Sequence, residues 1–332
     1  MATDPAMKPF VIGIDLGGTN VRAAVLERAT ENVIGRSDNI PSLAMDGPDI
    51  TIGQVAEAAF QAIAAAKISK DDLIGVGVAV PGVVKSSEGL VSYAPNFRDQ
   101  WRGVPIAKPL ADKLGVPVWI GNDANLATLG EYRFGAGRPV RHMVMLTLGT
   151  GVGGGVIIDG KLLEGADGGA GELGHMIINP GGRGGNAAFG TLEGEAQISA
   201  VVERATRIIQ SGRRTIIAQM CDYDRFALTP KIIAEAAEAG DAAAIEVFEE
   251  TGYLIGVAAG SLINIFNPQM IVIGGGVAQA GNLILDPIRR TAAATGLRIL
   301  SRNCQIVGAQ LGDNAGIFGA AALVLQKVAG ES

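Results

Sequence analysis

One pattern occurs twice in this chain of 332 residues: a short β-branched strand, a glycine-rich turn and a returning strand. The first copy comprises residues 10–15, 17–18 and 21–26, and the second comprises residues 143–148, 149–155 and 156–158. A supersecondary unit that recurs in this way is typical of an internal duplication. The pattern therefore predicts two similar halves of the α/β class.

The remaining chain alternates short buried strands with helical stretches, as α/β proteins do. Further strands are expected at residues 73–80, 116–120 and 270–273, and helices near 52–66, at 124–134, 198–208 and 315–328, and up to about 266 after Asp241. Thr229, which precedes Pro230, and Asp241 are predicted helix N-caps. We expect a smaller domain of residues 8–120 with the last helix, 314–330, and a larger domain of residues 121–313.

Charge argues against a nucleic-acid or membrane partner. The chain has 27 Lys and Arg against 33 Asp and Glu, a net charge of −6, and its basic residues form no cluster of five or more. The apolar region 254–276 is interrupted by polar residues, so it is predicted to be a buried helix, a turn and a buried strand.

The predicted location is the cytoplasm. The only cysteines, Cys221 and Cys304, lack metal-site spacing and suggest no disulfide framework. The first ten residues lack the basic and apolar regions of a signal peptide.

The first glycine turn follows a carboxylate at a strand end, in the order Asp15-Leu-Gly-Gly-Thr-Asn20. Gly17 and Gly18 let backbone N–H groups converge on phosphate oxygens, where a side chain would clash. Thr19 adds a hydroxyl, and Asp15 is a candidate ligand of Mg²⁺, directly or through water. A plain β-hairpin turn is the competing interpretation, because one glycine turn is weakly specific.

The second turn has five glycines in the seven residues 149–155, more than a hairpin needs. Two such turns on separate strand pairs are suited to holding a triphosphate. Neither is followed by the Gly-Lys-Ser/Thr of a P-loop, and neither opens a helix as a dinucleotide-binding turn does. The candidate phosphate-binding residues here are Gly149, Thr150, Gly151 and Gly153.

Asn122 and Asp123 follow a predicted strand between the two turns. A carboxylate there is placed to accept a proton from a hydroxyl that attacks phosphorus. The local sequence taken alone favours the competing interpretation, a helix N-cap at Asp123, because a helical stretch follows.

A glycine-rich loop carries Glu172 and His175, and Glu193 closes the same loop. These side chains are candidates to hydrogen-bond a polyol. Glu193 also stands at the start of a helix, where it would favour the helix dipole.

In this order, the motifs closely resemble those of the ROK family of sugar kinases, especially its glucokinases. The resemblance extends from about residue 10 to 328 and includes a third turn, Gly274, Gly275 and Gly276. It implies two ribonuclease-H-like domains of the actin-like ATPase and sugar-kinase fold, with a cleft between them. It also implies a hexose, most of all glucose, and ATP as substrates, Mg²⁺ as cofactor, and a dimer or tetramer.

The resemblance assigns a role to each motif. Asp123 would be the catalytic base that deprotonates the 6-hydroxyl of the sugar. The first two turns would hold the donor phosphates, and the third would lie against the nucleoside. The other hydroxyls would be bound by Asn96, Asn122, Glu172, His175 and Glu193.

The chain departs from the family pattern at one point. Family members commonly bind a structural Zn²⁺ through the motif histidine and three cysteines, whose positions fall here near Gly184, Asn186 and Thr191. One histidine cannot make a four-ligand zinc site, so no structural zinc is expected.

Several alternatives stay open. The acceptor can be an N-acylhexosamine, mannose or fructose, and the donor can be polyphosphate. A sugar-sensing repressor would carry a helix-turn-helix domain before the first turn, and nine residues before Phe10 are too few for one. An actin-like polymerising or chaperone ATPase would not call for the loop with Glu172 and His175.

Overall fold

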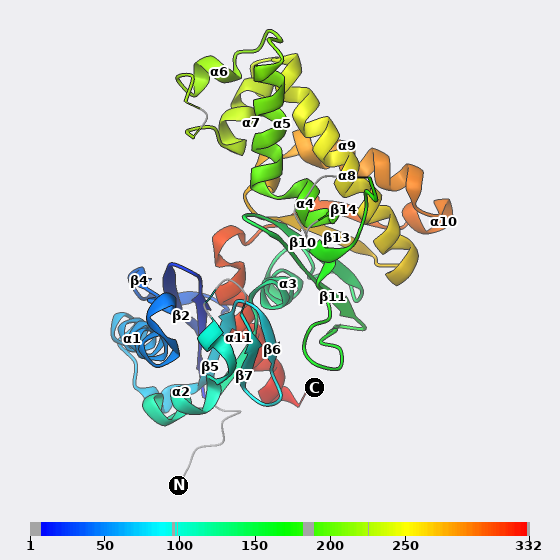
Figure 1. Cartoon of the computed structure of the whole chain (residues 1–332). Helices are drawn as coiled ribbons and strands as arrows, with labels where there is room; N and C mark the ends of the chain where they lie inside the picture. Colours follow the sequence, from blue (N-terminus) through cyan, green and yellow to red (C-terminus); the bar gives the residue numbers. More distant parts are fainter. Residues whose placement is uncertain (1–7, 95–96, 98, 182–188, 225, 331–332) are drawn as a thin grey trace. The chain divides into compact units, whose positions relative to one another are not determined.

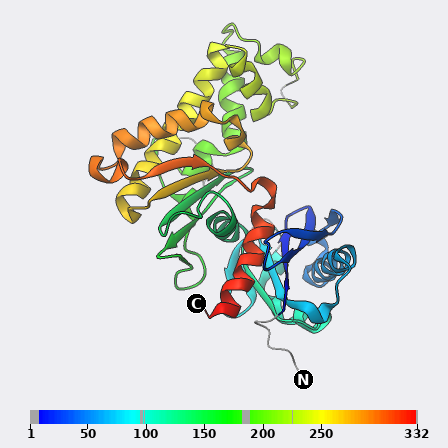
Figure 2. The same cartoon turned by 180° about the vertical axis from the view of Figure 1, so that it is seen from behind.

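The computed structural model describes residues 8–94, 97, 99–181, 189–224 and 226–330. These form two compact units (Figures 1 and 2). Unit 1 takes its described residues from Met1–Arg138, Lys161–Ala170 and Asp313–Ser332, and unit 2 from Pro139–Gly160 and Gly171–Gly312.

Unit 1 is built on a mixed sheet in the order β3-β2-β1-β5-β9. Its strands are β1 (Phe10–Leu16), β2 (Asn20–Glu27), β3 (Val33–Arg36), β5 (Leu73–Val80) and β9 (Val118–Asn122), with β4 (Ile40–Pro41) beside β2. β1 and β2 are antiparallel, whereas β1, β5 and β9 run parallel. A second, three-stranded sheet contains β6 (Val83–Lys85), β7 (Leu90–Tyr93) and β8 (Arg102–Pro105).

Helices cover the main sheet of unit 1. The helices are α1 (Pro48–Ala66), α2 (Ala107–Leu114), α3 (Asp123–Phe134) and α11 (Ala315–Ala329). α11 packs very closely on β1 and β5, because a Cβ on Gly13 would lie 2.0 Å from the Ile317 carbonyl oxygen and one on Gly77 would lie 1.9 Å from that of Ala320. Glycine at these two strand positions therefore sets the spacing between α11 and the sheet.

Unit 2 is built on four strands in the order β11-β10-β13-β14. They are β10 (Met143–Leu148), β11 (Val152–Ile158), β13 (Met270–Gly274) and β14 (Gln305–Gly308), whereas β12 (Lys161–Leu162) lies in a segment of unit 1. β10 and β11 form an antiparallel hairpin, and β10, β13 and β14 run parallel.

The two sheets share one plan. In each, an antiparallel hairpin is extended by two parallel strands on the side of its first strand. This arrangement confirms the two similar α/β halves that the repeated strand, turn and strand predict.

The helical part of unit 2 packs against one long helix, α8 (Ala242–Phe266), whose apolar face is buried. The other helices are α4 (Leu192–Ala196), α5 (Ile198–Gln210), α6 (Ile217–Met220), α7 (Pro230–Glu238), α9 (Asn282–Thr295) and α10 (Arg298–Ser301). Both predicted caps are confirmed: Thr229 Oγ1 accepts from the N–H of Ile232 at 3.3 Å, and Asp241 Oδ1 accepts from that of Ala244 at 2.9 Å.

Short 3₁₀ helices connect these elements: η2 (Ala44–Asp46), η3 (Lys70–Asp72), η4 (Asp99–Trp101), η5 (Leu173–His175), η6 (Val277–Ala280) and η7 (Gly312–Asn314). The apolar region 254–276 is the end of α8, a turn and β13, as predicted. Among the described residues, no helix combines the length and the hydropathy that a membrane span requires.

The structure differs from the expected domain division at two places. One is the segment Lys161–Ala170, expected in the larger domain but part of unit 1. The other is the first boundary: β9 and α3 belong to unit 1, which continues to Arg138, whereas the expected boundary is residue 120. The physical reason is packing, because α3 lies against α11: a Cβ on Gly319 would be 1.6 Å from the Leu126 carbonyl oxygen.

Candidate active site

The first glycine turn is a tight hairpin loop between Leu16 and Val21, which pair across β1 and β2. Gly17 N–H donates to the Asn20 carbonyl at 2.8 Å. Buried Ser42 holds the other side of the loop, since its N–H donates to the Thr19 carbonyl at 2.8 Å and its Oγ to the Gly18 carbonyl at 2.9 Å. With the carbonyls held in this way, the N–H groups of Gly18 and Thr19 have no hydrogen-bond partner among the described residues.

Asp15 lies beside this loop and forms an ion pair with Arg22. Asp15 Oδ2 is 2.7 Å from Arg22 Nη2, which also donates to the Asp313 carbonyl at 2.9 Å. Mg²⁺ in phosphoryl-transfer sites is held by one or two carboxylates and by the substrate phosphates. The Asp15 carboxylate, next to N–H groups that can bind phosphate, fits such a site. In the present structure Arg22 neutralises the charge of this carboxylate.

The parallel strands of unit 1 bring Asp15 and Asn122 to the same edge of the sheet. Asp15 pairs in register with Ala79 of β5, and Val80 pairs with Asn122 of β9. Because carboxyl ends of parallel strands meet at one edge, the first turn and the start of α3 are neighbours along it.

Asn122, and not Asp123, is the N-cap of α3, so the cap interpretation of Asp123 is wrong. Asn122 Oδ1 accepts from the N–H of Asn125 at 2.9 Å, and its Nδ2 donates to the Gly82 carbonyl at 2.9 Å. Asp123 is the first residue of the helix, and its Oδ1 accepts from the N–H of Ala124 at 2.8 Å. The side chain of Asn122 therefore caps the helix, and Asp123 stands in the first turn, where the helix dipole favours a negative charge.

The second turn repeats the construction of the first but is shorter than the sequence suggests. Leu148 pairs with Val152, and Gly149 N–H donates to the Gly151 carbonyl at 2.9 Å. The N–H groups of Thr150 and Gly151 have no partner in the described part of the chain. Gly153 lies in β11 opposite Thr147, outside the loop. The expected loop of residues 149–155 is therefore too long, and the structure corrects it.

Glu193 lies directly against this second turn. Its Oε2 accepts from the N–H of Val152 at 2.9 Å, and a Cβ on Gly151 would lie 2.5 Å from the same oxygen. The first turn of α4 thus connects a predicted sugar ligand to a predicted phosphate-binding loop, a link that the sequence did not reveal.

Glu172 and His175 stand at the two ends of η5, and both are exposed. The residues between them anchor the segment: Leu173 is buried, and a Cβ on Gly174 would be 2.0 Å from the Val152 carbonyl oxygen. Glu172, His175 and Glu193 are therefore all carried by elements that pack on β11 next to the second turn. The other predicted sugar ligand, Asn96, lies outside the described residues.

The third turn touches the second. Gly275 has φ 85°, and a Cβ on it would lie 2.4 Å from the Leu148 carbonyl oxygen. Position 275 requires glycine for two reasons, because its backbone is left-handed and because the Leu148 carbonyl occupies the space of a side chain. Gly274, Gly275 and Gly276 thus lie at the base of the second turn in unit 2.

The residues present do not fit a structural zinc ion. Thr191 occupies one of the positions where a cysteine would stand, and its Oγ1 caps α4 by accepting from the N–H of Gly194 at 3.1 Å. Gly184 and Asn186 lie outside the described residues. Among the residues that the structure does describe, no three His, Cys, Asp or Glu side chains are grouped as a metal site.

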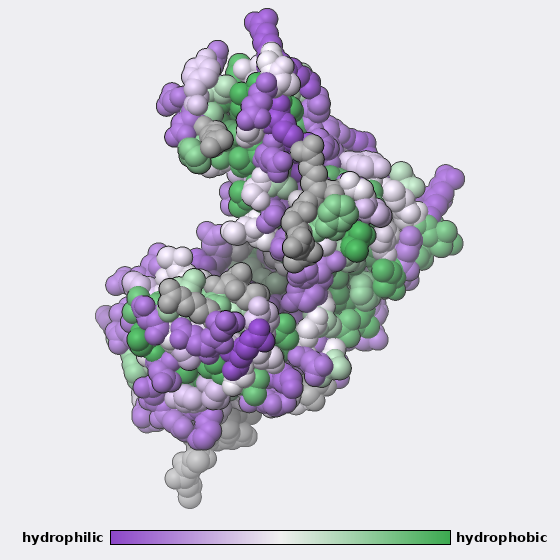
Figure 3. All heavy atoms as spheres, in the orientation of Figure 1, coloured by the Kyte–Doolittle hydropathy of each residue, from purple (hydrophilic) through white to green (hydrophobic). Residues whose placement is uncertain are grey.

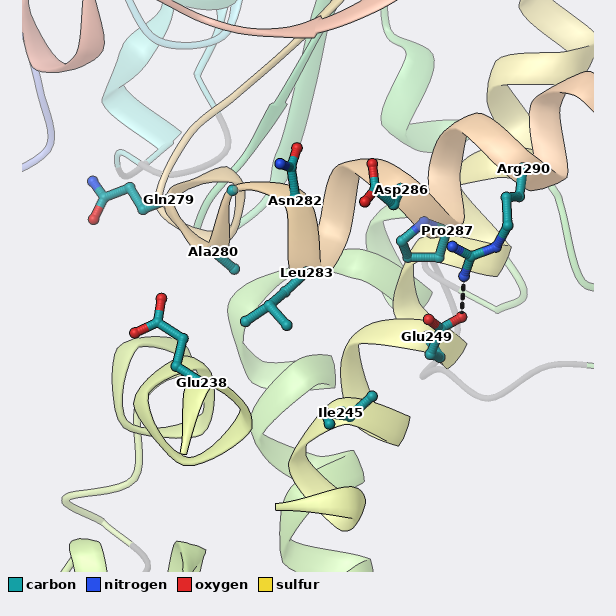
Figure 4. A pocket seen from close by; sticks show the side chains of 11 residues that line it. Glu238, Ile245, Glu249, Gln279, Ala280, Asn282, Leu283, Asp286, Pro287 and Arg290 are labelled. Carbon is teal, nitrogen blue, oxygen red and sulfur yellow. Dashed lines mark hydrogen bonds and ion pairs between the residues drawn. The ribbon is translucent and has the colours of Figure 1, made fainter. Parts of the chain in front are cut away.

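A pocket of about 460 Å³ lies between α7 and α8 on one side and η6 and α9 on the other (Figure 4). It contains three carboxylates, those of Glu238, Glu249 and Asp286, and Glu249 is paired with Arg290 at 2.5 Å. None of the predicted phosphate or sugar ligands lines it. Its acidic lining disfavours a phosphate, so we do not place the donor phosphates there.

Comparison with known proteins gives a consistent result across the chain. Residues 11–327 match the ROK family. The chain is 37% identical over 321 residues to a glucokinase from Halalkalibacterium halodurans, an alignment that covers 96% of each protein.

A solved structure gives a similar match. The crystal structure of a ROK family glucokinase from Streptomyces griseus, in complex with glucose and AMPPNP, has a TM-score of 0.79 and 31% identity, covering 96% of this chain and 99% of that one. Repressors are also similar: a xylose repressor from Caldicellulosiruptor bescii is 33% identical over 256 residues, which are 76% of this chain and 63% of that protein.

Proposed function

The chain belongs to the ROK family, and we propose that it is a hexose kinase that transfers the γ-phosphoryl group of ATP to the 6-hydroxyl of glucose. The observation that carries this proposal is the likeness, over nearly the whole chain, to a glucokinase whose crystal structure holds glucose and AMPPNP. The glucokinase relative from Halalkalibacterium halodurans, aligned over almost its full length, supports the same substrates.

The two hairpin loops are proposed to hold the donor phosphates. Each offers two adjacent N–H groups without a partner among the described residues: those of Gly18 and Thr19, and those of Thr150 and Gly151. Backbone N–H groups in such loops bind phosphate oxygens. This source of positive field lets a chain with a net charge of −6 bind a polyanion. The third turn is proposed to lie against the nucleoside.

Asp15 is proposed to hold Mg²⁺, directly or through water. The ion, when bound, would neutralise charge on the phosphates during transfer. Arg22 occupies the Asp15 carboxylate in the present structure, so its side chain would share or give up this contact as the cation arrives.

Asp123 is the proposed catalytic base. Its carboxylate accepts the proton of the sugar 6-hydroxyl as that oxygen forms a bond to the γ-phosphorus, and the bond from phosphorus to the bridging oxygen breaks to release ADP. The N–H of Ala124 donates to Oδ1 at 2.8 Å and so helps to orient the carboxylate of Asp123.

The remaining sugar hydroxyls are proposed to bind Asn96, Asn122, Glu172, His175 and Glu193. Asn122 uses one lone pair of Oδ1 and one N–H for structure, which leaves one of each for a hydroxyl. Glu193 likewise keeps Oε1 for the sugar, since Oε2 accepts from Val152.

A coupled assay over sugars and donors tests the proposal. Glucose with ATP should give the highest kcat/KM, above N-acylhexosamines, mannose and fructose, and above polyphosphate as donor. A preference for another pair would reassign the substrate. Sugar binding without turnover for any pair would favour a sensor, the function of the repressor relatives.

A homo-oligomer is the proposed state of the protein in solution. Figure 3 shows hydrophobic side chains gathered on unit 2 where α10 meets the C-terminal end of α8. Ile265, Leu297 and Ile299 are 65%, 59% and 69% exposed there. A second copy would cover such a surface. Light scattering after size-exclusion chromatography should give a multiple of 34.0 kDa, and a mass of one chain would contradict the proposal.

The cytoplasm is the proposed location. Cys221 and Cys304 are both free thiols. Burial raises the pKa of the Cys304 thiol to about 11, so it is protonated and unreactive at neutral pH. Two unpaired thiols suit a reducing compartment.

A further inference from the structure

Arg204 is a buried charge in unit 2 that the proposed chemistry does not use. It lies in α5 and is 4% exposed. Its Nη2 is 3.0 Å from Glu195 Oε2, its Nη1 donates to the Glu195 carbonyl at 2.6 Å, and its Nε donates to Glu250 Oε1 at 3.0 Å. Three guanidinium nitrogens thus join α5 to α4 and α8.

Such an arrangement is costly to bury, because two charges must leave water. Its geometry offsets that cost, since the guanidinium is paired with carboxylates and also satisfies a backbone carbonyl near the C-terminal end of α4. Glu195 is itself 7% exposed. Replacing a buried ion pair by apolar side chains of similar volume is often neutral or stabilising. Stability alone therefore does not explain the pair of Arg204 and Glu195, and the question is which segments it positions.

The answer lies at the base of the sugar-binding loop. Ile178 and Asn179 N–H groups both donate to the Gly190 carbonyl, at 2.9 and 3.1 Å, and the Leu192 N–H donates to the Met176 carbonyl at 2.8 Å. Asn179 Nδ2 then donates to Glu195 Oε1 at 3.1 Å. The loop base is therefore tied to the same carboxylate that Arg204 holds by its other oxygen.

The two ends of this loop carry the predicted sugar ligands His175 and Glu193, and both ends are connected to the contacts of Glu195. Glu195 and Glu193 share the short helix α4, and Met176, at the loop base, directly follows His175. A five-residue helix has little stability of its own, so its orientation must come from tertiary contacts.

We propose that Arg204 is a positioning residue for sugar binding. Through Glu195 and Asn179 it fixes α4 and the loop base, and it thereby orients Glu193 and His175. The inference rests on the proposed hexose site.

Three variants and one control test this inference. Asn179→Ala removes only the link to the loop, and Arg204→Met removes the cation. Glu195→Met combined with Arg204→Met replaces both charges by apolar side chains. The control is Arg213→Met, because Arg213, in the segment between α5 and α6, forms an exposed ion pair with Glu246 of α8 at 2.6 Å. Within the described part of the chain, Arg213 makes no hydrogen bond or ion pair with Arg204, Glu195 or Asn179.

Asn179→Ala and Arg204→Met should raise the KM for glucose on the order of tenfold, with the KM for ATP unchanged within about twofold. Amide hydrogen exchange at Ile178, Asn179 and Leu192 should accelerate in both. Arg213→Met should alter neither quantity. An unchanged KM for glucose in Asn179→Ala, or equal effects on both substrates, would overturn the inference.

The double variant separates positioning from stability. Replacing both buried charges should return the melting temperature close to that of the wild type, whereas the KM for glucose should stay raised because Asn179 still lacks its acceptor. If the KM recovers together with the melting temperature, Arg204 is merely structural. If the wild-type protein turns over no hexose, the proposed function fails, while the exchange rates still report whether Arg204 orders the loop base.

Discussion

Gly18 is the residue at which phosphate binding can be tested without disturbing the protein. A Cβ built on Gly18 has no protein atom within 4 Å. Gly18→Ala should therefore leave the melting temperature unchanged, yet raise the KM for ATP on the order of tenfold, because the methyl group would occupy the space of a phosphate oxygen.

The test of Gly18→Ala is to compare the change in the KM for ATP with the change in the KM for glucose in steady-state kinetics. The KM for glucose should stay within about twofold of the wild-type value. An unchanged KM for ATP would mean that no phosphate approaches the first turn.

Single residues show how far the sequence alone could reach. Asp15, Asp123 and the glycine turns could be predicted because they stand at strand ends with a distinctive spacing. Ser42 and Arg204 could not, since each acts on residues that only the folded chain brings close. Asp123 was ambiguous because a base and a cap look alike in sequence, and only the contact from Asn122 to Asn125 separates them.

At the scale of elements, the packing of α8 on α9 depends on glycine. A Cβ on Gly256 would lie 2.4 Å from Thr291 Cβ and 2.9 Å from the Ile288 carbonyl oxygen. Gly256→Ala should cost about 1–3 kcal/mol of unfolding free energy, because the two helices must move apart.

Gly53 in α1 is the matched control for Gly256, since a Cβ on Gly53, unlike one on Gly256, would have no atom within 4 Å. Gly53→Ala should stabilise the protein by about 0.5–1 kcal/mol, through the better helix propensity of alanine. Urea denaturation of both variants measures the difference, and equal effects of the same sign would contradict the packing account.

The start of α8 predicts a dependence of stability on pH. Burial raises the pKa of Asp241, but hydrogen bonds from the Ile216 and Ala244 N–H groups and from Thr215 outweigh it, so the pKa lies below its ordinary value. A lowered carboxyl pKa contributes stability that is present above the unfolded-state pKa, about 3.9, and is lost as the pH falls through the folded-state pKa.

Replacing Asp241 tests that dependence. Asp241→Ala should cost about 1 kcal/mol at pH 7, and the difference from the wild type should shrink below about pH 4. Thermal denaturation between pH 3 and 7 measures it. Asp241→Asn, which keeps the cap but not the charge, is the control, and a loss for Asp241→Ala that is constant across this range would refute the contribution of the charge.

The elements themselves were predicted where their sequence period was long or their ends were marked. β5 matches its expected range, Leu73–Val80, and α8 begins at its predicted cap. The small sheet of β6, β7 and β8 was not predicted, because strands of three or four residues leave no clear alternation. The helices α2 and α9 were not predicted either, and α9 contains Pro287, a residue that disfavours a helix interior. The length of the second turn was overestimated, because the glycines within β11 cannot be told from loop residues in the sequence.

At the scale of the whole molecule, the two units are variations on one sheet plan, and each carries one of the hairpin loops proposed to bind phosphate. Unit 1 adds the proposed catalytic base, directly after β9, whereas unit 2 adds the loop proposed to bind the sugar and the third turn. The duplication could be predicted from the repeated hairpins, but the division of labour between the units required the strand register and the contacts of Asn122 and Glu193.

The most direct test of this account is the turnover of Asp123→Asn. Asparagine keeps the size of the side chain and an oxygen for the Ala124 N–H, so glucose and AMPPNP should bind in calorimetry as they do to the wild type. The value of kcat should fall by about 10²–10⁴-fold, whereas Asp112→Asn, at an exposed carboxylate of α2, should not change it. A kcat of Asp123→Asn close to that of the wild type would contradict the central claim that Asp123 is the base of a sugar kinase.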